Sequence, residues 1–304
     1  MIPRPPAPSG PHGSPAWALE PAPPWRVGRA RWDFEQPLVM GVLNATPDSF
    51  SDGGEFLQPE RALRRAQQML EEGADVLDLG GASSHPQARP VSPQEELERI
   101  AALVERLAAE LPLPLSIDTQ VPAVAEECLR LGAHLVNDVS GLVSPDMARV
   151  AARHDVPLVI TYNNFAVPKE ASGLSFTSDL LAFFAERLDE VESLGLRRVI
   201  LDPGYGFGKS LEENLIVLRS LPLLQRFNRP VLVCTSRKGS LGKLVGESVP
   251  RERLGASLAS SLYAVTRGAH LVRVHDVKAF RQALLTWRAI ESFRGEAPRL
   301  KPHG

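Results

Sequence analysis

The segment GAHLVND, residues 132–138, contains the pattern from which the fold is predicted. Its glycine follows a helical stretch, at a place where positive φ suits the C-terminal cap of a helix. A short apolar run comes next, and the segment ends on the polar pair Asn137 and Asp138. The same order recurs in GADVLDLG (73–80) and GAHLVRVHD (268–276). The sequence thus indicates a repeating unit of helix, buried strand and polar strand end.

Eight runs rich in Val, Ile and Leu are expected to be strands: 37–44, 74–80, 114–118, 134–138, 157–162, 198–202, 230–235 and 270–276. They are nearly continuously apolar, which is typical of parallel strands buried on both faces. Helical periodicity fills most of the gaps, and Ser92 with Glu95 suggests a helix N-cap. Eight such units over about 260 residues predict a (β/α)₈ TIM barrel. An open doubly wound sheet is the alternative, although no G-x-G-x-x-G follows the first run.

Prolines crowd the first 24 residues, where little apolar periodicity is present. We therefore expect a disordered Pro-rich leader over residues 1–30, the barrel over 31–294 and a flexible tail over 295–304.

The composition excludes several classes of protein. The chain has 304 residues, with 34 Lys+Arg against 36 Asp+Glu and a net charge of −2, so no general field attracts nucleic acid or acidic membranes. Cys128 and Cys234 lack a C-x-x-C spacing, which argues against a disulfide scaffold or a cysteine zinc site. No apolar run reaches the roughly 20 residues that span a bilayer. We expect a cytoplasmic protein.

Polar residues stand at nearly every expected strand end: Asn44, Asp78, Asp118, Asn137, Asp202, the trio Ser236, Arg237 and Lys238, and Arg273 with His275. In a barrel these ends meet at one mouth, where active sites are built. Asp and Asn also cap helices and end strands for structural reasons. Their recurrence at seven strands favours the functional interpretation.

Four of these side chains form a set of acceptors and donors: Asp118, Asn137, Asp202 and Lys238. Carboxylates accept parallel N–H bonds, so the set suits a flat heterocycle with adjacent N–H groups and a carbonyl. Arg273, His275 and Asn44 suit an oxyanion such as pyrophosphate, and Asn44 is also able to ligate a hard cation. Asp78 is expected to support the mouth through hydrogen bonds to neighbouring side chains.

Six motifs together strongly resemble the dihydropteroate synthase family: MGVLNATPDSFSDGGEF (40–56), SIDT (116–119), NDVSG (137–141), DPGYGFGK (202–209), SRK (236–238) and RVHD (273–276). The resemblance runs from about residue 37 to about residue 290. It implies a TIM barrel that condenses 6-hydroxymethyl-7,8-dihydropterin pyrophosphate with para-aminobenzoate. The products would be 7,8-dihydropteroate, on the route to folate, and pyrophosphate.

The resemblance also implies roles for individual residues. The pterin would be bound by Asp118, Asn137, Asp202 and Lys238. Pyrophosphate would be bound by Asn44, Ser84, His85, Arg273 and His275, with Mg²⁺ at Asn44. Aminobenzoate would lie at Phe207, Ser236 and the backbone near Pro86. The catalytic residues would be Asp118, Lys238, Arg273 and His275, in a homodimer with no nucleic-acid or membrane partner.

Two segments depart from the family pattern. The usual G-G-E-S-T-R-P-G is GGASSHPQ here (80–87), which changes Ala82, Ser84, His85 and Gln87, and the usual M-H-M is replaced by Thr161-Tyr162-Asn163. These changes keep two alternatives open: a catalytically weak or repurposed pterin-binding paralogue, and a pterin-dependent methyltransferase that passes methyl groups to a corrinoid. Intact SRK and RVHD motifs favour the synthase.

Overall fold

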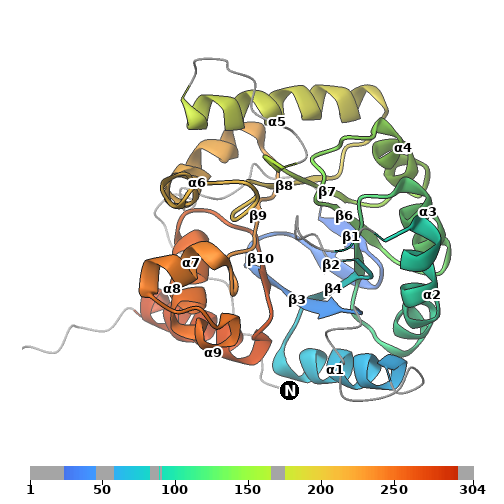
Figure 1. Ribbon diagram of the computed structural model, residues 1–304, viewed down its shortest axis with the longest axis horizontal. Helices are drawn as coiled ribbons and strands as arrows, with labels where there is room; N and C mark the ends of the chain where they lie inside the picture. The colour runs from blue at the N-terminus through green and yellow to red at the C-terminus, as the bar shows by residue number, and fades with distance from the viewer. Residues whose placement is uncertain (1–23, 46–57, 83–88, 90, 166–174, 294–304) are drawn as a thin grey trace, which may run out of the picture.

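A ring of eight parallel strands stands at the centre of the computed structural model, which describes residues 24–45, 58–82, 89, 91–165 and 175–293 (Figure 1). The strands are β3 (Leu38–Asn44), β4 (Val76–Gly80), β5 (Leu115–Asp118), β6 (Leu135–Asp138), β7 (Leu158–Thr161), β8 (Val199–Asp202), β9 (Leu232–Val233) and β10 (Leu271–Val274). Their order is β8-β7-β6-β5-β4-β3-β10-β9. An isolated parallel bridge between Leu201 and Val231 joins the two end strands. The predicted (β/α)₈ barrel is confirmed, and each predicted run contains one strand.

Helices surround the strands (Figure 1). The α-helices of the described residues are α1 (Gln58–Glu72), α2 (Pro93–Glu110), α3 (Pro122–Arg130), α4 (Pro145–Arg153), α5 (Phe176–Ser193), α6 (Leu211–Leu224), α7 (Gly239–Val245), α8 (Leu254–Thr266) and α9 (Val277–Ser292). Two short 3₁₀ helices, η3 (Gln225–Phe227) and η4 (Pro250–Glu252), lie in the connections. In this part of the chain no helix has both the length and the apolar character needed to cross a membrane.

The predicted helix caps are confirmed. Gly73, Gly132 and Gly268 have φ of +96°, +109° and +101°, a region in which residues with a Cβ are strained. At the start of α2, the Ser92 hydroxyl accepts a hydrogen bond from the Glu95 amide at 3.1 Å. The three glycines follow the ends of α1, α3 and α8, where the chain turns into the next strand.

Two apolar layers fill the structure. The first lies between the strands and the helices, and the second is a separate cluster that contains one side chain from each of seven strands: Met40, Val76, Leu135, Val159, Ile200, Leu232 and Leu271. Successive strand residues point to opposite faces, so these seven face the barrel axis while their neighbours face the helices. These side chains fill the barrel axis below the carboxyl ends of the strands, which leaves the mouth as the candidate binding region.

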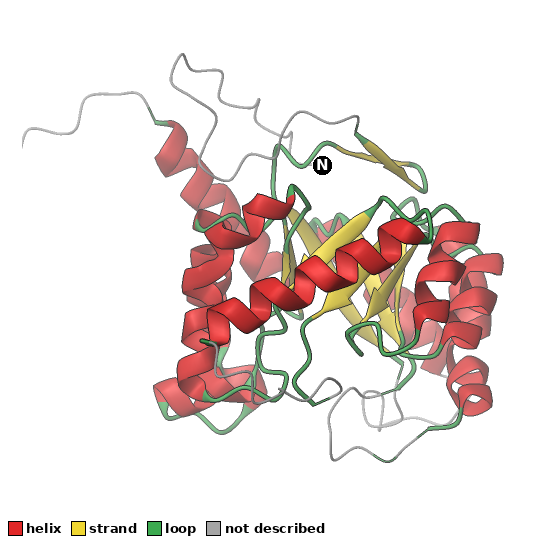
Figure 2. Cartoon of the chain, turned by 90° about the horizontal axis from the view of Figure 1, so that it is seen from above, coloured by secondary structure: helices red, strands yellow, loops and turns green. Residues whose placement is uncertain are grey.

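A hairpin lies across the amino-terminal end of the barrel (Figure 2). It consists of β1 (Trp25–Val27) and β2 (Ala30–Trp32), which pair antiparallel. Val27, Trp32 and Phe34 join the interior cluster, and the Phe34 ring meets the His270 ring edge to face at 6.1 Å. His270 precedes β10, so the hairpin seals the end opposite the mouth.

The expected boundary of the leader at residue 30 is wrong, because residues 25–30 belong to this folded hairpin. Two strands of three residues each are too short for a period-2 pattern to stand out beside a proline-rich stretch. The remainder of the expected leader, 1–23, and the tail, 294–304, lie outside the described residues.

Candidate active site

Strand register brings the polar strand ends to one level of the barrel. Gly80 pairs with Asn44 on one side and Asp118 on the other. Asp118 in turn pairs with Asn137, and Asp202 pairs with Thr161. Neighbouring strands thus end at matching heights, which places these groups around a shared opening.

A buried ion triad occupies the mouth. Arg273 Nε donates to Asp78 Oδ2 at 2.5 Å, and Arg273 Nη2 donates to Asp118 Oδ2 at 2.8 Å. The three side chains are 14%, 0% and 11% exposed, respectively. Asp78 also accepts from Ser116 Oγ at 2.5 Å and from Asn137 Nδ2 at 3.1 Å. The expected supporting role of Asp78 is confirmed, since it contacts both an arginine and an amide of the predicted site.

Burial shifts the pKa values of the charged groups in this mouth. It raises the pKa of Asp118 to about 7, and the nearby Arg273 guanidinium limits the rise. Burial likewise raises the pKa of Asp202, whose Oδ1 accepts from the Gly204 amide at 2.8 Å. Burial by itself lowers the pKa of Arg273, but Asp78 and Asp118 hold that pKa well above the usual value. Carboxyl groups with raised pKa values in a cleft are candidates for a functional site.

Asn137 has an unsatisfied acceptor. Its side chain is 1% exposed, and its Nδ2 is used by Asp78. Its Oδ1 is buried and has no hydrogen-bond partner among the described residues. A buried carbonyl without a donor is costly, so this atom is available to an N–H group of a ligand.

Lys238 lies close to the same carboxylates. Its ammonium lowers the pKa of both Asp118 and Asp202, and its Nζ lies 4.2 Å from the centre of the Phe207 ring. A Cβ on Gly206 would come within 2.9 Å of the lysine side chain, and Gly206 has φ of +86°. The glycine therefore allows the loop after β8 to approach Lys238.

Lys209, in the same loop, is a structural cation. Its Nζ donates to three carbonyl oxygens, those of Tyr162 at 2.6 Å, Gly204 at 2.9 Å and Phe207 at 3.2 Å. Three acceptors satisfy an ammonium. The lysine therefore connects the loop after β8 to the end of β7. The sequence predicts no role for Lys209, because a lysine after glycines gives no signal for carbonyl binding.

Ser236 and His275 form a second contact across the mouth. The Ser236 hydroxyl accepts from the His275 backbone amide at 3.2 Å and lies 3.0 Å from His275 Nδ1. Burial, reinforced by Arg273 and Arg237, lowers the pKa of His275 to about 3, so the imidazole is neutral at pH 7. With the hydroxyl donating to Nδ1, we assign the ring proton to Nε2. The neutral His275 therefore offers a hydrogen-bond donor at the mouth.

Of the remaining predicted site residues, the structure describes one. Asn44 lies at the end of β3 with its side chain exposed. Ser84, His85 and Pro86 lie outside the described residues. The described part of the chain contains no cluster of three or more His, Cys, Asp or Glu side chains arranged for a metal ion.

The substitutions after β7 are accommodated by local contacts. The Tyr162 ring packs against the rings of Phe176 and Phe183, with centroids 5.9 and 5.0 Å away. Asn163 is buried, and its Nδ2 donates to the Val139 carbonyl at 2.6 Å. The tyrosine therefore belongs to the packing under α5, and the asparagine joins the loops after β6 and β7.

Known proteins resemble this chain over most of its length. The family described as "Pterin binding enzyme" matches residues 40–275. Dihydropteroate synthase of Synechocystis is 41% identical over 268 residues, which are 86% of this chain and 92% of that protein. The structure of Xanthomonas albilineans dihydropteroate synthase with 4-aminobenzoic acid superposes with a TM-score of 0.82 at 40% identity, covering 86% of this chain and 96% of that one. The same enzyme with 7,8-dihydropteroate gives a TM-score of 0.79 at 39% identity, over 86% and 97% of the two chains.

We predict that Asp78→Ala lowers the free energy of unfolding by about 3 kcal/mol, because it leaves a buried guanidinium with one of its two carboxylates. Urea denaturation measures the change. The control is Asp146→Ala, which removes a carboxylate that is 67% exposed and paired with Arg149 and should cost less than about 1 kcal/mol. Equal effects of the two substitutions would contradict the importance of the triad.

Proposed function

The chain belongs to the dihydropteroate synthase family of pterin-binding enzymes, and from this premise we propose that its barrel mouth condenses 6-hydroxymethyl-7,8-dihydropterin pyrophosphate with para-aminobenzoate. The products are 7,8-dihydropteroate, an intermediate of folate biosynthesis, and pyrophosphate. One observation carries the proposal: the buried Oδ1 of Asn137 lacks a partner within the described residues and lies on the strand beside Asp118. That arrangement suits the hydrogen-bonding edge of a pterin.

The pterin is recognised by acceptors of different strength. Asn137 Oδ1 and the carboxylates of Asp118 and Asp202 accept its N–H groups, and the Lys238 ammonium donates to its carbonyl or ring nitrogen. The two carboxylates also favour positive charge on the heterocycle. Their raised pKa values support this role, because a bound N–H donor returns the stabilisation that burial removes.

Pyrophosphate is bound on the Arg273 side of the mouth. Arg273 supplies a permanent positive charge, and His275 supplies a neutral N–H donor from Nε2. Ser84 and His85 complete the proposed site.

Mg²⁺ fits the neutral oxygen donor that Asn44 offers. This ion keeps several waters and binds proteins through one or two ligands together with substrate phosphates, so a large carboxylate cluster is unnecessary. When bound, the ion would neutralise charge on the departing pyrophosphate. Asn44 at the exposed end of β3 is the residue that would hold it.

Aminobenzoate lies between Phe207 and Ser236, with the backbone near Pro86 completing the site. Phe207 is buried beneath Lys238, and Ser236 is fixed by His275. The carbon–oxygen bond to pyrophosphate breaks with its electron pair leaving on oxygen. The amine nitrogen of aminobenzoate then attacks the resulting methylene carbon and loses a proton. No covalent bond to the protein is required.

We predict that purified protein supplied with Mg²⁺, the dihydropterin pyrophosphate and aminobenzoate releases pyrophosphate, and that Arg273→Lys lowers kcat/KM by about 10²-fold or more. Lysine retains the charge but cannot contact both carboxylates and the leaving group. A coupled phosphate assay measures the rate. The control is Lys278→Ala, an exposed cation on α9, which should keep full activity.

Release that does not depend on aminobenzoate, or pterin binding without any release, would contradict the synthase. The second outcome would favour a pterin-binding paralogue or a methyltransferase.

We predict that affinity for 6-hydroxymethylpterin rises about eightfold between pH 6 and pH 7.5, as the Asp118 carboxyl with its pKa of about 7 ionises. Affinity rises with pH because the ionised carboxylate accepts two N–H bonds, and protonation at lower pH removes that capacity. Calorimetry at both pH values measures the change, and Asp118→Asn should abolish most of it. A flat or falling affinity in the unsubstituted protein would remove Asp118 from the pterin site.

The proposed active form is a homodimer. Exposed apolar side chains gather on α7, the following turn and α8: Leu244, Val245, Val249, Leu254 and Tyr263, each at least 38% exposed. Several exposed apolar side chains on neighbouring elements suit a protein interface. Sedimentation velocity should give twice the chain mass of 33.1 kDa, and Leu244→Glu should give the monomer. A monomeric unsubstituted protein at all concentrations would contradict the dimer.

The enzyme is proposed to be cytoplasmic, because Cys128 and Cys234 are both free and buried, as expected of thiols that are never paired. Cell fractionation with an antibody to the chain tests this location.

A further inference from the structure

The residue between Ser236 and Lys238 adopts a strained backbone conformation. Arg237 has φ of +60°, the left-handed region that costs energy for a residue with a long side chain. Such strain persists only where surrounding contacts hold it in place. The contacts of the Arg237 side chain and backbone therefore show which parts of the structure depend on this conformation.

The Arg237 side chain reaches the loop after β10. Its Nε donates to Asp276 Oδ2 at 3.0 Å, and its Nη2 donates to Asp276 Oδ1 at 2.6 Å. Two parallel hydrogen bonds fix both the distance and the orientation of the partners. Both side chains are about 30% exposed. This bidentate pair therefore sets the position of one loop relative to the other.

The backbone of Arg237 is anchored on the opposite side. Its amide donates to Ser257 Oγ on α8 at 3.0 Å, and its carbonyl accepts from Arg253 Nη1 at 2.9 Å. Arg253 is buried, and a Cβ on Gly242 would come within 2.5 Å of its Nε. Arg237 thus connects a base formed with α7 and α8 to the short loop between β10 and α9.

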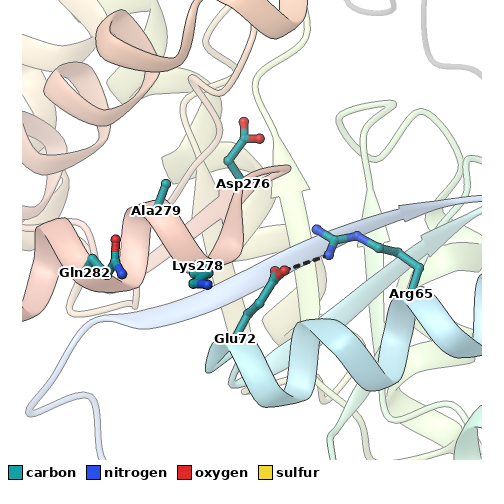
Figure 3. Close-up of a pocket in the computed structure, with 6 residues that line it drawn as sticks. All are labelled: Arg65, Glu72, Asp276, Lys278, Ala279 and Gln282. Carbon is teal, nitrogen blue, oxygen red and sulfur yellow. Dashed lines mark hydrogen bonds and ion pairs between the residues drawn. The ribbon is translucent and has the colours of Figure 1, made fainter.

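A cavity lies on the other side of the loop after β10. Asp276 lines a cavity of about 230 Å³ with Arg65 and Glu72 of α1 and three residues at the start of α9, Lys278, Ala279 and Gln282 (Figure 3). Arg65 pairs with Glu72 at 3.0 Å and donates from Nη2 to the His275 carbonyl at 3.2 Å. Because this cavity borders Asp276, packing does not hold the aspartate on that side. Its two hydrogen bonds with Arg237 hold it on the other side.

We propose that Arg237 is a positioning residue, whose bidentate pair with Asp276 holds Ser236 and His275 in register across the mouth. The proposal rests on the proposed function, in which Ser236 contacts aminobenzoate and His275 contacts pyrophosphate. The two loops are joined at adjacent positions, by Ser236 to His275 and by Arg237 to Asp276. Loss of the second contact leaves the position of His275 to its contact with Ser236 and to the hydrogen bond from Arg65. Misplacement of reacting groups by a fraction of an ångström lowers rates severely.

The test uses Arg237→Gly, Asp276→Asn and the double variant in the full chain. Glycine adopts φ of +60° freely, so Arg237→Gly keeps the backbone contacts to Ser257 and Arg253 and should fold with an unchanged melting temperature. Each single substitution should lower kcat/KM for aminobenzoate about tenfold. The double variant should have about the same kcat/KM as the more impaired of the two single variants, because both substitutions break the same interaction. Arg237→Lys, which keeps the charge without the planar fork, should recover part of the rate.

The control is Arg251→Gln, which removes an arginine that is 78% exposed on η4 and should leave the rate unchanged. Three results would each overturn the proposal. The losses in kcat/KM multiply in the double variant, the single variants stay within twofold of the unsubstituted protein, or the loss of activity follows a fall in melting temperature. If the unsubstituted protein releases no pyrophosphate, the proposed function itself fails, which is a separate result. Affinity for 6-hydroxymethylpterin should stay within about twofold in Arg237→Gly. Glycine keeps the backbone path that leads to Lys238, and the pterin acceptors lie on other strands.

Discussion

A buried guanidinium held between two carboxylates is the interaction on which the mouth of this barrel depends. Arg273 contacts Asp78 and Asp118 on two different strands, and Asp78 extends the network to Asn137. Buried charges are tolerated only when they are paired and hydrogen-bonded. The pairing therefore keeps Arg273 charged inside the protein, and it fixes the strand ends that carry the proposed pterin site relative to the arginine that would bind pyrophosphate.

This arrangement suits a reaction in which charge separates. The departing group is anionic and the carbon that it leaves becomes electron-poor, so a site needs donors at one end and carboxylates at the other. Arg273 is the residue at which the two ends meet. Its Nη2 pairs with Asp118, while its Nη1, whose partner is the weak acceptor Cys234 Sγ at 3.8 Å, is able to turn to an anion. The neutral His275 adds a directed hydrogen bond without adding repulsion beside that guanidinium.

Much of the fold was predictable from sequence because its signals are local and repeated. Apolar runs placed all eight strands, and glycines marked where helices end. The hairpin at Trp25 was missed, because its stability comes from Trp32 and Phe34 packing into the distant barrel interior. The candidate site was predicted as a set of residue types at strand ends. What the sequence could not reveal were the contacts between distant loops, such as the Lys209 ammonium among three carbonyls or the strained Arg237 paired with Asp276.

The most direct test of the account is a crystal structure with 6-hydroxymethylpterin and pyrophosphate bound together in the presence of Mg²⁺. We predict that Arg273 keeps its contacts to Asp78 and Asp118 while its Nη1 leaves Cys234 Sγ and reaches pyrophosphate. Asn137 Oδ1 should accept an N–H group of the pterin. An Arg273 side chain that leaves Asp78 to reach the anion, or an Asn137 carbonyl without a contact to the pterin, would contradict it.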